Sequence, residues 1–315
     1  MNDPHEKTGK RPDRNKVIII AGPTASGKSD RAVALAREIN GAIINADSQQ
    51  IYKGLPVLSA QPSPEDMAEI PHHLYSFMDG NKRCDAHFWK ECALKTIQKV
   101  VSLGQTPIIT GGTGLYINAL VDGLSPIPDI PQPVRDEAVM LLKDLGNEKF
   151  YDRLVKKDPI AAKTITPGNS KMMVRYWETV SHTGKSLAEW QKKPLEGPPG
   201  NLAFYMTVIL PSRKVLIARC EKRFDAMLAS GAIEEVETVL DKIERGVLPK
   251  DTPVQNALGF KALSEFIRGQ ISYDEAREKS VIQTRQYIKR QTTWFRHQKP
   301  ANLVCHTTEK DEILA

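Results

Sequence analysis

The sequence of 315 residues is poor in cysteine and has no long apolar run. Its four cysteines include no Cys-x-x-Cys pair, which argues against a disulfide framework and favours free thiols in a reducing cytosol. The apolar run at residues 17–20 is far too short for a signal peptide or a membrane-spanning helix. We therefore expect a cytoplasmic protein without membrane contact, and we expect it to be a monomer.

Acidic residues are absent from residues 281–300, and the whole chain has a net charge of +6. Such a charge favours a polyanionic partner. In a helix, this segment would place Arg285, Lys289 and Arg296 in one stripe beside apolar residues that dock the helix. The stripe would follow a phosphate backbone, and the alternative is an ordinary solvated helix face.

Residues 22–29 read GPTASGKS and match G-x-x-x-x-G-K-[ST] between a buried strand and a helix. The glycines allow backbone N–H groups to turn toward an anion, and the helix N-terminus adds a positive dipole. Lys28 supplies a mobile charge, and Ser29 supplies a hydroxyl for a phosphate-bound Mg²⁺. This P-loop is predicted to bind a diphosphate or triphosphate, and the alternative is a glycine-rich turn without a ligand.

Two more strands are predicted at 42–44 and 107–109, each followed by a polar or glycine-rich loop. Asp47 follows the first strand, and loops beyond the carboxyl ends of strands line the ligand crevice of an open α/β sheet. We therefore expect Asp47 near the P-loop, although a helix N-cap or turn aspartate is the alternative. The second strand lacks the terminal aspartate that holds Mg²⁺ in proteins that hydrolyse nucleoside triphosphates. The bound phosphate is then interpreted as a leaving group.

Proline-rich segments at 126–133 and 194–199 divide the chain, and only helical patterns lie between them. A strand pattern returns at 203–210. We predict an α/β fold with a P-loop NTPase-like parallel sheet, helices on both faces and a helical insertion domain. The predicted parts are a tail at 1–15, a core at 16–124 and 203–300, the insertion at 125–202 and a C-terminal tail at 301–315.

Four stretches in this order carry a resemblance to one family: GPTASGKS at 22–29, ADSQQIYKG at 46–54, GGTGLY at 111–116 and TRQYIKRQTTWFR at 284–296. The chain resembles bacterial tRNA dimethylallyltransferases, also called tRNA isopentenyltransferases, over about residues 16–300. The resemblance implies transfer of a dimethylallyl group from dimethylallyl diphosphate to the exocyclic N6 amine of the adenosine just 3′ of the anticodon, with release of pyrophosphate.

The resemblance also implies roles for particular residues. Asp47 would accept the amine proton, while Thr24, Lys28 and Arg223 would contact the donor diphosphate together with Mg²⁺ on Ser29. The implied diphosphate-binding residues are Gly22, Pro23, Thr24, Ala25, Ser26, Gly27, Lys28 and Ser29. The insertion would clamp the anticodon stem-loop, and the implied tRNA-binding residues are Asp47, Ser48, Gln49, Gln50, Thr113, Arg135, Lys171, Arg175, Asn256, Lys289 and Arg290.

The sequence departs from the family pattern at two places. Lys171 and Met172 stand where Gln-Arg is common, and Asn256 stands where a basic residue is usual. Both places belong to the implied tRNA-binding regions. Three alternatives also contain a P-loop: a small-molecule kinase, an adenylate prenyltransferase that acts on free nucleotides, and a non-catalytic RNA-binding ATPase.

Overall fold

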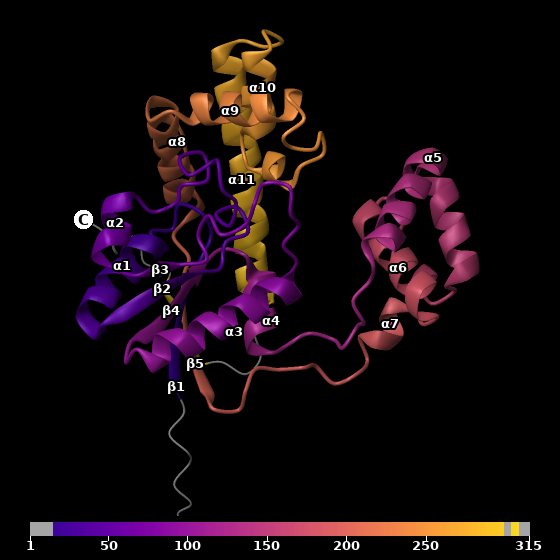
Figure 1. Cartoon of the computed structure of the whole chain (residues 1–315), viewed down its shortest axis with the longest axis horizontal. Helices are drawn as coiled ribbons and strands as arrows, with labels where there is room; N and C mark the ends of the chain where they lie inside the picture. Colours follow the sequence, from indigo (N-terminus) through magenta and orange to yellow (C-terminus); the bar gives the residue numbers. More distant parts are fainter. Residues whose placement is uncertain (1–14, 299–303, 309–315) are drawn as a thin grey trace, which may run out of the picture. The chain divides into compact units, whose positions relative to one another are not determined.

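A computed structural model describes residues 15–298 and 304–308 of the protein. Its core is a six-stranded sheet in which neighbouring strands pair in parallel, in the order β3-β2-β4-β1-β5-β6 (Figure 1). The strands are β1 (Asn15–Ala21), β2 (Gly41–Asn45), β3 (His72–His73), β4 (Thr106–Gly111), β5 (Leu202–Ile209) and β6 (Val304–Thr308).

The central strands form where apolar residues run without interruption. Ile19 and Ile20 of β1 are both buried, as are all five residues of β2, because helices cover both faces of the sheet. The strand order places β4 between β2 and β1. The loops that follow these three parallel strands therefore lie side by side at one edge of the sheet.

Helices pack on both faces of this sheet. Ala32 and Ala36 of α1 pack on one face, whereas Trp89, Ile117 and Phe295 pack on the other from α3, α4 and α11. The predicted α/β class with two helical layers is therefore confirmed. The helices flanking the sheet are α1 (Lys28–Ile39), α3 (Ala86–Ser102), α4 (Gly114–Val121) and α11 (Tyr273–His297), and α2 (Pro64–Glu69) lies in the connection from β2 to β3.

A second apolar core lies beyond the sheet and is formed mainly by helices. Helices α8, α9 and α10 form it with the first half of α11 and with Leu55 and Leu58 of the loop after β2. The sequence pattern did not separate this cluster from the sheet. Its helices are α8 (Arg213–Ala229), α9 (Ala232–Glu244) and α10 (Phe260–Ile267), with a short 3-10 turn η2 (Pro253–Asn256).

The chain divides into two compact units: residues 123–197 form one, and the remainder of the chain forms the other. The smaller unit is helical, as expected for the insertion, and its core includes Phe150, Leu154 and Tyr176. Its longest helix is broken at Gly146, whose φ of 72° is left-handed. Its elements are α5 (Gln132–Lys157), η1 (Ala161–Lys163), α6 (Ser170–Thr183) and α7 (Leu187–Trp190).

Two predicted boundaries need correction. The C-terminal tail at 301–315 is wrong for residues 304–308, which form β6 and extend the sheet by pairing with β5. Asn15, assigned to the N-terminal tail, begins β1 because it continues the pairing with β5 at Leu202. The rest of the two tails, 1–14, 301–303 and 309–315, lies outside the described residues. Within the described part of the chain, no helix is both long enough and apolar enough to span a membrane.

Candidate functional site

The loop between β1 and α1 has the backbone of a phosphate-binding loop. Gly27 has a φ of 86° and directly precedes α1, whose first turn begins at Lys28. Gly22 approaches β5 so closely that a Cβ atom there would lie 2.5 Å from the Ile209 carbonyl oxygen. Both glycines are therefore required by the local geometry. The N-terminus of α1 directs its positive dipole into the cavity that this loop lines.

Two cations lie beside this loop, one buried (Lys28) and one half-buried (Arg223). The Lys28 Nζ atom donates to the Pro23 carbonyl oxygen at 3.4 Å, and the Arg223 guanidinium of α8 donates to Thr24 Oγ1 at 2.5 Å. Burial lowers the pKa of Lys28 to about 8, opposed by the charge of Asp47 and assisted by that of Arg223. Burial likewise lowers the pKa of Arg223. Such a pair favours an anionic ligand because a negative charge offsets the cost of burying them.

Two more polar groups lie at the same loop: the Arg219 guanidinium and the Ser26 hydroxyl. Arg219, one turn before Arg223 on α8, donates to the Ser26 carbonyl oxygen at 3.5 Å. The Ser26 hydroxyl is buried and has no hydrogen-bond partner within the part of the chain that the structure describes. An unpaired buried hydroxyl next to two cations fits an incoming phosphate oxygen.

Asp47 lies in the loop after β2 and is 5% exposed. Its Oδ1 accepts from the Gln49 backbone N–H at 3.0 Å, and its own N–H donates to Asn45 Oδ1 at 2.9 Å. The turn role considered from the sequence is thus real. This turn contact engages one carboxylate oxygen, and Asp47 also lines the same cavity as Lys28.

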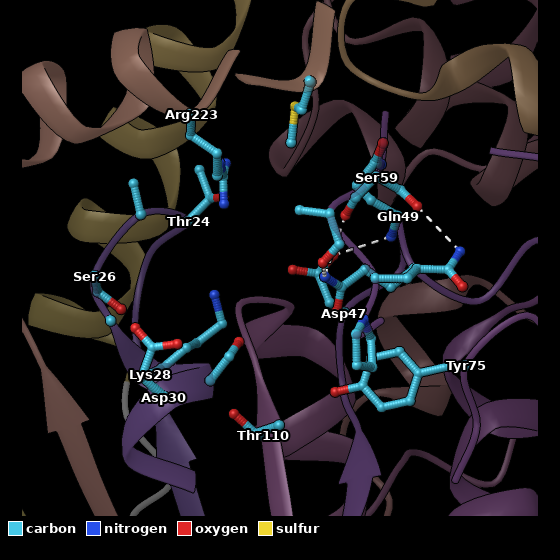
Figure 2. A pocket seen from close by; sticks show the side chains of 18 of the residues that line it. Thr24, Ser26, Lys28, Asp30, Asp47, Gln49, Ser59, Tyr75, Thr110 and Arg223 are labelled. Carbon is cyan, nitrogen blue, oxygen red and sulfur yellow. Dashed lines mark hydrogen bonds between the residues drawn. The ribbon is translucent and has the colours of Figure 1, made fainter. Parts of the chain in front are cut away.

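The cavity has a volume of about 810 Å³. Figure 2 shows Thr24, Lys28 and Arg223 on one side of it and Asp47 on the other. Apolar side chains complete the lining, so the cavity offers a cationic end, a carboxylate and an apolar wall. The apolar residues in the lining include Leu58, Phe224, Met227 and Leu258.

The structure brings most of the residues predicted for the diphosphate site together. Residues 24–29 line the cavity together with Asp47, Gln49 and Gln50. Gly22 and Pro23 belong to the loop but do not line the cavity. Ser48 and Thr113 contact each other: the Ser48 N–H donates to Thr113 Oγ1 at 2.9 Å.

The other predicted RNA contacts are dispersed. Lys171, Arg135 and Arg175 belong to the smaller unit, where both arginines lie near Glu178. Asn256 is exposed, and its Nδ2 donates to the Pro253 carbonyl oxygen in η2. Neither Asn256 nor these three residues line the cavity.

The predicted basic stripe on α11 needs correction. Arg285 forms an ion pair with Glu221 of α8, so its charge is neutralised within the protein. Lys289 and Arg290 are exposed and border a second hollow of about 490 Å³. The other residues around that hollow are Gln286, Thr293, Trp294, His297 and Gln298. Lys289 and Arg296 of the predicted stripe are exposed, so the correction concerns Arg285 alone.

Sequence reasoning missed Tyr287 and Gln291 as parts of the site. Tyr287 lines the cavity, and Gln291 is buried against the P-loop, where its Oε1 accepts from the Thr24 N–H. Their i,i+4 spacing within residues 284–296 was the available signal, because it places both on one helix face.

A divalent cation fits one position. Ser29 lies in the first turn of α1 and lines the cavity. The described residues contain no group of three or more His, Cys, Asp or Glu side chains that would hold a metal alone. Mg²⁺ commonly binds through one or two protein ligands and substrate phosphates, which matches a lone hydroxyl beside a phosphate loop.

Comparison with known proteins identifies the family. The family model described as IPP transferase matches residues 50–298. The chain belongs to the IPP transferase family. A tRNA dimethylallyltransferase of Paramagnetospirillum magneticum is 45% identical over 298 residues, which cover 95% of this chain and 93% of that protein. The corresponding enzyme of Zymomonas mobilis is 41% identical over 91% of this chain and 89% of its own length.

Solved structures of IPP transferases share the fold. The tRNA isopentenylpyrophosphate transferase of Bacillus halodurans is 31% identical with a TM-score of 0.63, covering 93% of this chain and 90% of its own. A eukaryotic dimethylallyltransferase solved acting on tRNA is 27% identical with a TM-score of 0.75, covering 89% of this chain and 70% of its own. The family assignment therefore agrees with the fold and with the phosphate loop.

Proposed function

We propose that the protein is a tRNA dimethylallyltransferase. It transfers the dimethylallyl group from dimethylallyl diphosphate to N6 of the adenosine just 3′ of the anticodon and releases pyrophosphate. The observation that carries this proposal is that one cavity is lined by two cations, buried Lys28 and half-buried Arg223, together with a buried carboxylate, Asp47.

The P-loop side binds the donor. Lys28, Arg223 and the Ser26 hydroxyl hold the diphosphate, and their charges stabilise the negative charge that grows on it as the carbon–oxygen bond breaks. The N-terminus of α1 adds its dipole to the same end. When bound on Ser29, Mg²⁺ supplies further charge neutralisation for the diphosphate.

The Asp47 side receives the adenosine. The N6 atom attacks the first carbon of the dimethylallyl group, the bond from that carbon to the diphosphate oxygen breaks, and its electron pair leaves with pyrophosphate. The proton lost from N6 passes to the Asp47 carboxylate. An adenine amine is a weak nucleophile, so the orientation of the base against the donor contributes more than the basicity of the carboxylate.

The tRNA has to deliver this adenosine out of a stacked loop into the cavity. Exposed Lys289 and Arg290 on α11 supply phosphate contacts. Ser48, Gln49, Gln50 and Thr113 are proposed to contact the RNA near the cavity. Further tRNA contacts come from Arg135, Lys171, Arg175 and Asn256, and the smaller helical unit holds the anticodon stem-loop.

A product assay tests the function. The protein is incubated with Mg²⁺, labelled dimethylallyl diphosphate and an unmodified tRNA transcript with adenosine 3′ of the anticodon, and the RNA is digested to nucleosides. The expected product is N6-prenylated adenosine. A transcript with guanosine at that position is the matched control. Free adenosine monophosphate and ATP are tested in parallel as acceptors, and prenylation of either instead of tRNA would indicate a prenyltransferase acting on nucleotides and refute the proposal. Phosphoryl transfer from ATP with release of ADP, without prenylation of tRNA, would indicate a kinase and refute it as well.

A further inference from the structure

Helix α11 joins two of the three loops at the edge of the sheet through one buried side chain, Gln291. Its Oε1 accepts from the Thr24 backbone N–H at 2.9 Å, and its Nε2 donates to the Gly112 carbonyl oxygen at 2.9 Å. Thr24 lies in the loop after β1, and Gly112 lies in the loop after β4. A Cβ atom at Gly112 would lie 2.2 Å from the Nε2 atom, so only glycine permits this approach.

Thr24 is held at both its backbone and its side chain. Its backbone N–H is directed to Gln291 and is therefore engaged within the protein. Its side-chain hydroxyl accepts from Arg223 and lies in the cavity lining. Gln291 thus fixes the backbone of the residue that orients the Arg223 guanidinium.

One turn earlier on the same face, Tyr287 joins the loop after β4 to the loop that contains Asp47. Its side chain lines the cavity, and the side chains of Thr113 and Ser48 lie close enough to its hydroxyl to act on its pKa, which they lower. Ser48 directly follows Asp47. The Ser48 N–H donates to Thr113 Oγ1 at 2.9 Å, and the Thr113 hydroxyl donates to Ser48 Oγ at 3.2 Å, so the two loops are joined beside Tyr287. Burial and the nearby Asp47 charge raise the pKa of Tyr287, so its hydroxyl keeps its proton near neutral pH.

We propose that Gln291 and Tyr287 are positioning residues of the transfer reaction. Gln291 fixes the donor loop, Tyr287 fixes the Asp47 loop, and the rigid turn of α11 between them sets the separation of donor and acceptor. This inference rests on the proposed function. Its physical basis is that transfer between two bound groups is sensitive to small displacements, whereas loops without such ties are mobile.

Two variants separate the two roles. Gln291→Met keeps the length of the side chain but removes both hydrogen bonds, so the dissociation constant for dimethylallyl diphosphate is expected to rise about tenfold. Affinity for tRNA is expected to stay unchanged in this variant. Tyr287→Phe removes only the hydroxyl, so the single-turnover rate with both substrates saturating is expected to fall about tenfold while donor affinity is retained.

Gln283→Met is the matched control. Gln283 lies on the same helix, and its Oε1 accepts from the Gly259 backbone N–H at 2.9 Å, away from Thr24, Gly112 and Ser48. Gln283→Met therefore loses a side-chain to backbone hydrogen bond of the kind lost in Gln291→Met, and its melting temperature is expected to fall to a similar extent. Donor affinity and the single-turnover rate are expected to match the wild type.

The outcomes distinguish this inference from the proposed function. Failure of the wild type to prenylate the transcript would refute both. Wild-type transfer, combined with unchanged donor affinity in Gln291→Met and an unchanged rate in Tyr287→Phe, would overturn the positioning roles alone. The same would follow if Gln283→Met lost affinity and rate to the same extent, because the effects would then reflect stability.

Discussion

Buried or half-buried basic side chains occur in both units of the chain, but they are neutralised differently. In the smaller unit, Glu178 accepts from Arg175 at 2.5 Å and lies 4.0 Å from the Arg135 guanidinium. In the larger unit, Lys28 and Arg223 donate only to neutral oxygens, and no carboxylate among the described residues lies within 4.0 Å of either. The first arrangement is internally compensated, and the second fits the anionic donor proposed above.

This difference separates structural cations from ligand-binding cations. A buried charge without a partner destabilises the fold unless a ligand supplies the opposite charge. The family resemblance assigns Arg223 to the donor diphosphate, whereas it assigns Arg135 and Arg175 to the tRNA. The structure distinguishes them, because Arg175 and Arg135 share the partly compensating charge of Glu178.

The largest expected effect is that of Asp47→Asn. Asp47 is the acidic group whose charge acts on both Lys28 and Arg223, and it is proposed to accept the N6 proton. The variant keeps the turn bond to Gln49 but loses the proton acceptor. The single-turnover rate is expected to fall by about 10²–10⁴-fold, measured by rapid quench with saturating substrates. Full activity would remove Asp47 from the mechanism.

Lys28→Met tests whether the uncompensated cation serves the ligand. Loss of this charge is expected to lower the transfer rate by about 10²–10³-fold, since one contact to a developing anion is typically worth about 3 kcal/mol. Stability without donor and Mg²⁺ is expected to rise, because a desolvated charge is removed.

This stability gain has a predicted pH dependence. Folding lowers the pKa of Lys28 to about 8, so between about pH 8 and 10.4 only the unfolded wild-type chain keeps this proton. The wild-type free energy of unfolding therefore rises with pH in this range, whereas that of Lys28→Met has no such contribution. The difference between the two free energies, measured by urea unfolding, is expected to become smaller. A stability loss in Lys28→Met at pH 7 would instead assign this lysine a structural role.

Glu178→Gln tests the smaller unit, where Glu178 offsets the charges of Arg135 and Arg175. Two arginines lose their shared carboxylate, so we expect a loss of about 2 kcal/mol in the stability of the smaller unit. Urea unfolding followed by the fluorescence of Trp177 measures this loss. Donor binding is expected to stay unchanged, and a weakened donor affinity would show that the two groups of cations are not independent.

A smaller effect is expected from the exposed cations of α11. Replacing both Lys289 and Arg290 with glutamate is expected to weaken tRNA binding about tenfold and to reduce the salt dependence of its affinity. Filter binding at several salt concentrations measures both. Replacing Lys214 and Lys242, exposed residues of α8 and α9, with glutamate is the control with the same change in net charge. Equal effects in the two proteins would leave the α11 stripe without a specific role.

Much of the phosphate site was predictable because its signals are local. A buried strand, two glycines, a lysine and a helix occur within about twenty consecutive residues, and parallel strand ends bring Asp47 to the same edge. The uninterrupted apolar residues of β1, β2 and β4 likewise predicted the centre of the sheet.

The features that could not be predicted depend on distant partners. Glu221, which neutralises Arg285, is 64 positions away, and Gln291 meets Thr24 across 267 positions. The strand β6 is only five residues long and is defined by pairing with β5. Helical periodicity identifies the apolar face of α8–α11, but not that these faces enclose a core separate from the sheet.

The affinity of Asp47→Asn for dimethylallyl diphosphate tests most directly the division of labour between the two sides of the cavity. Titration calorimetry with Mg²⁺ measures it without any transfer step. If the cations bind the donor and Asp47 serves the acceptor, the dissociation constant stays within about threefold of the wild type or becomes lower, because a negative charge near the diphosphate is removed. Loss of donor binding in a folded Asp47→Asn protein would contradict the account, because the carboxylate would then act on the donor through the metal.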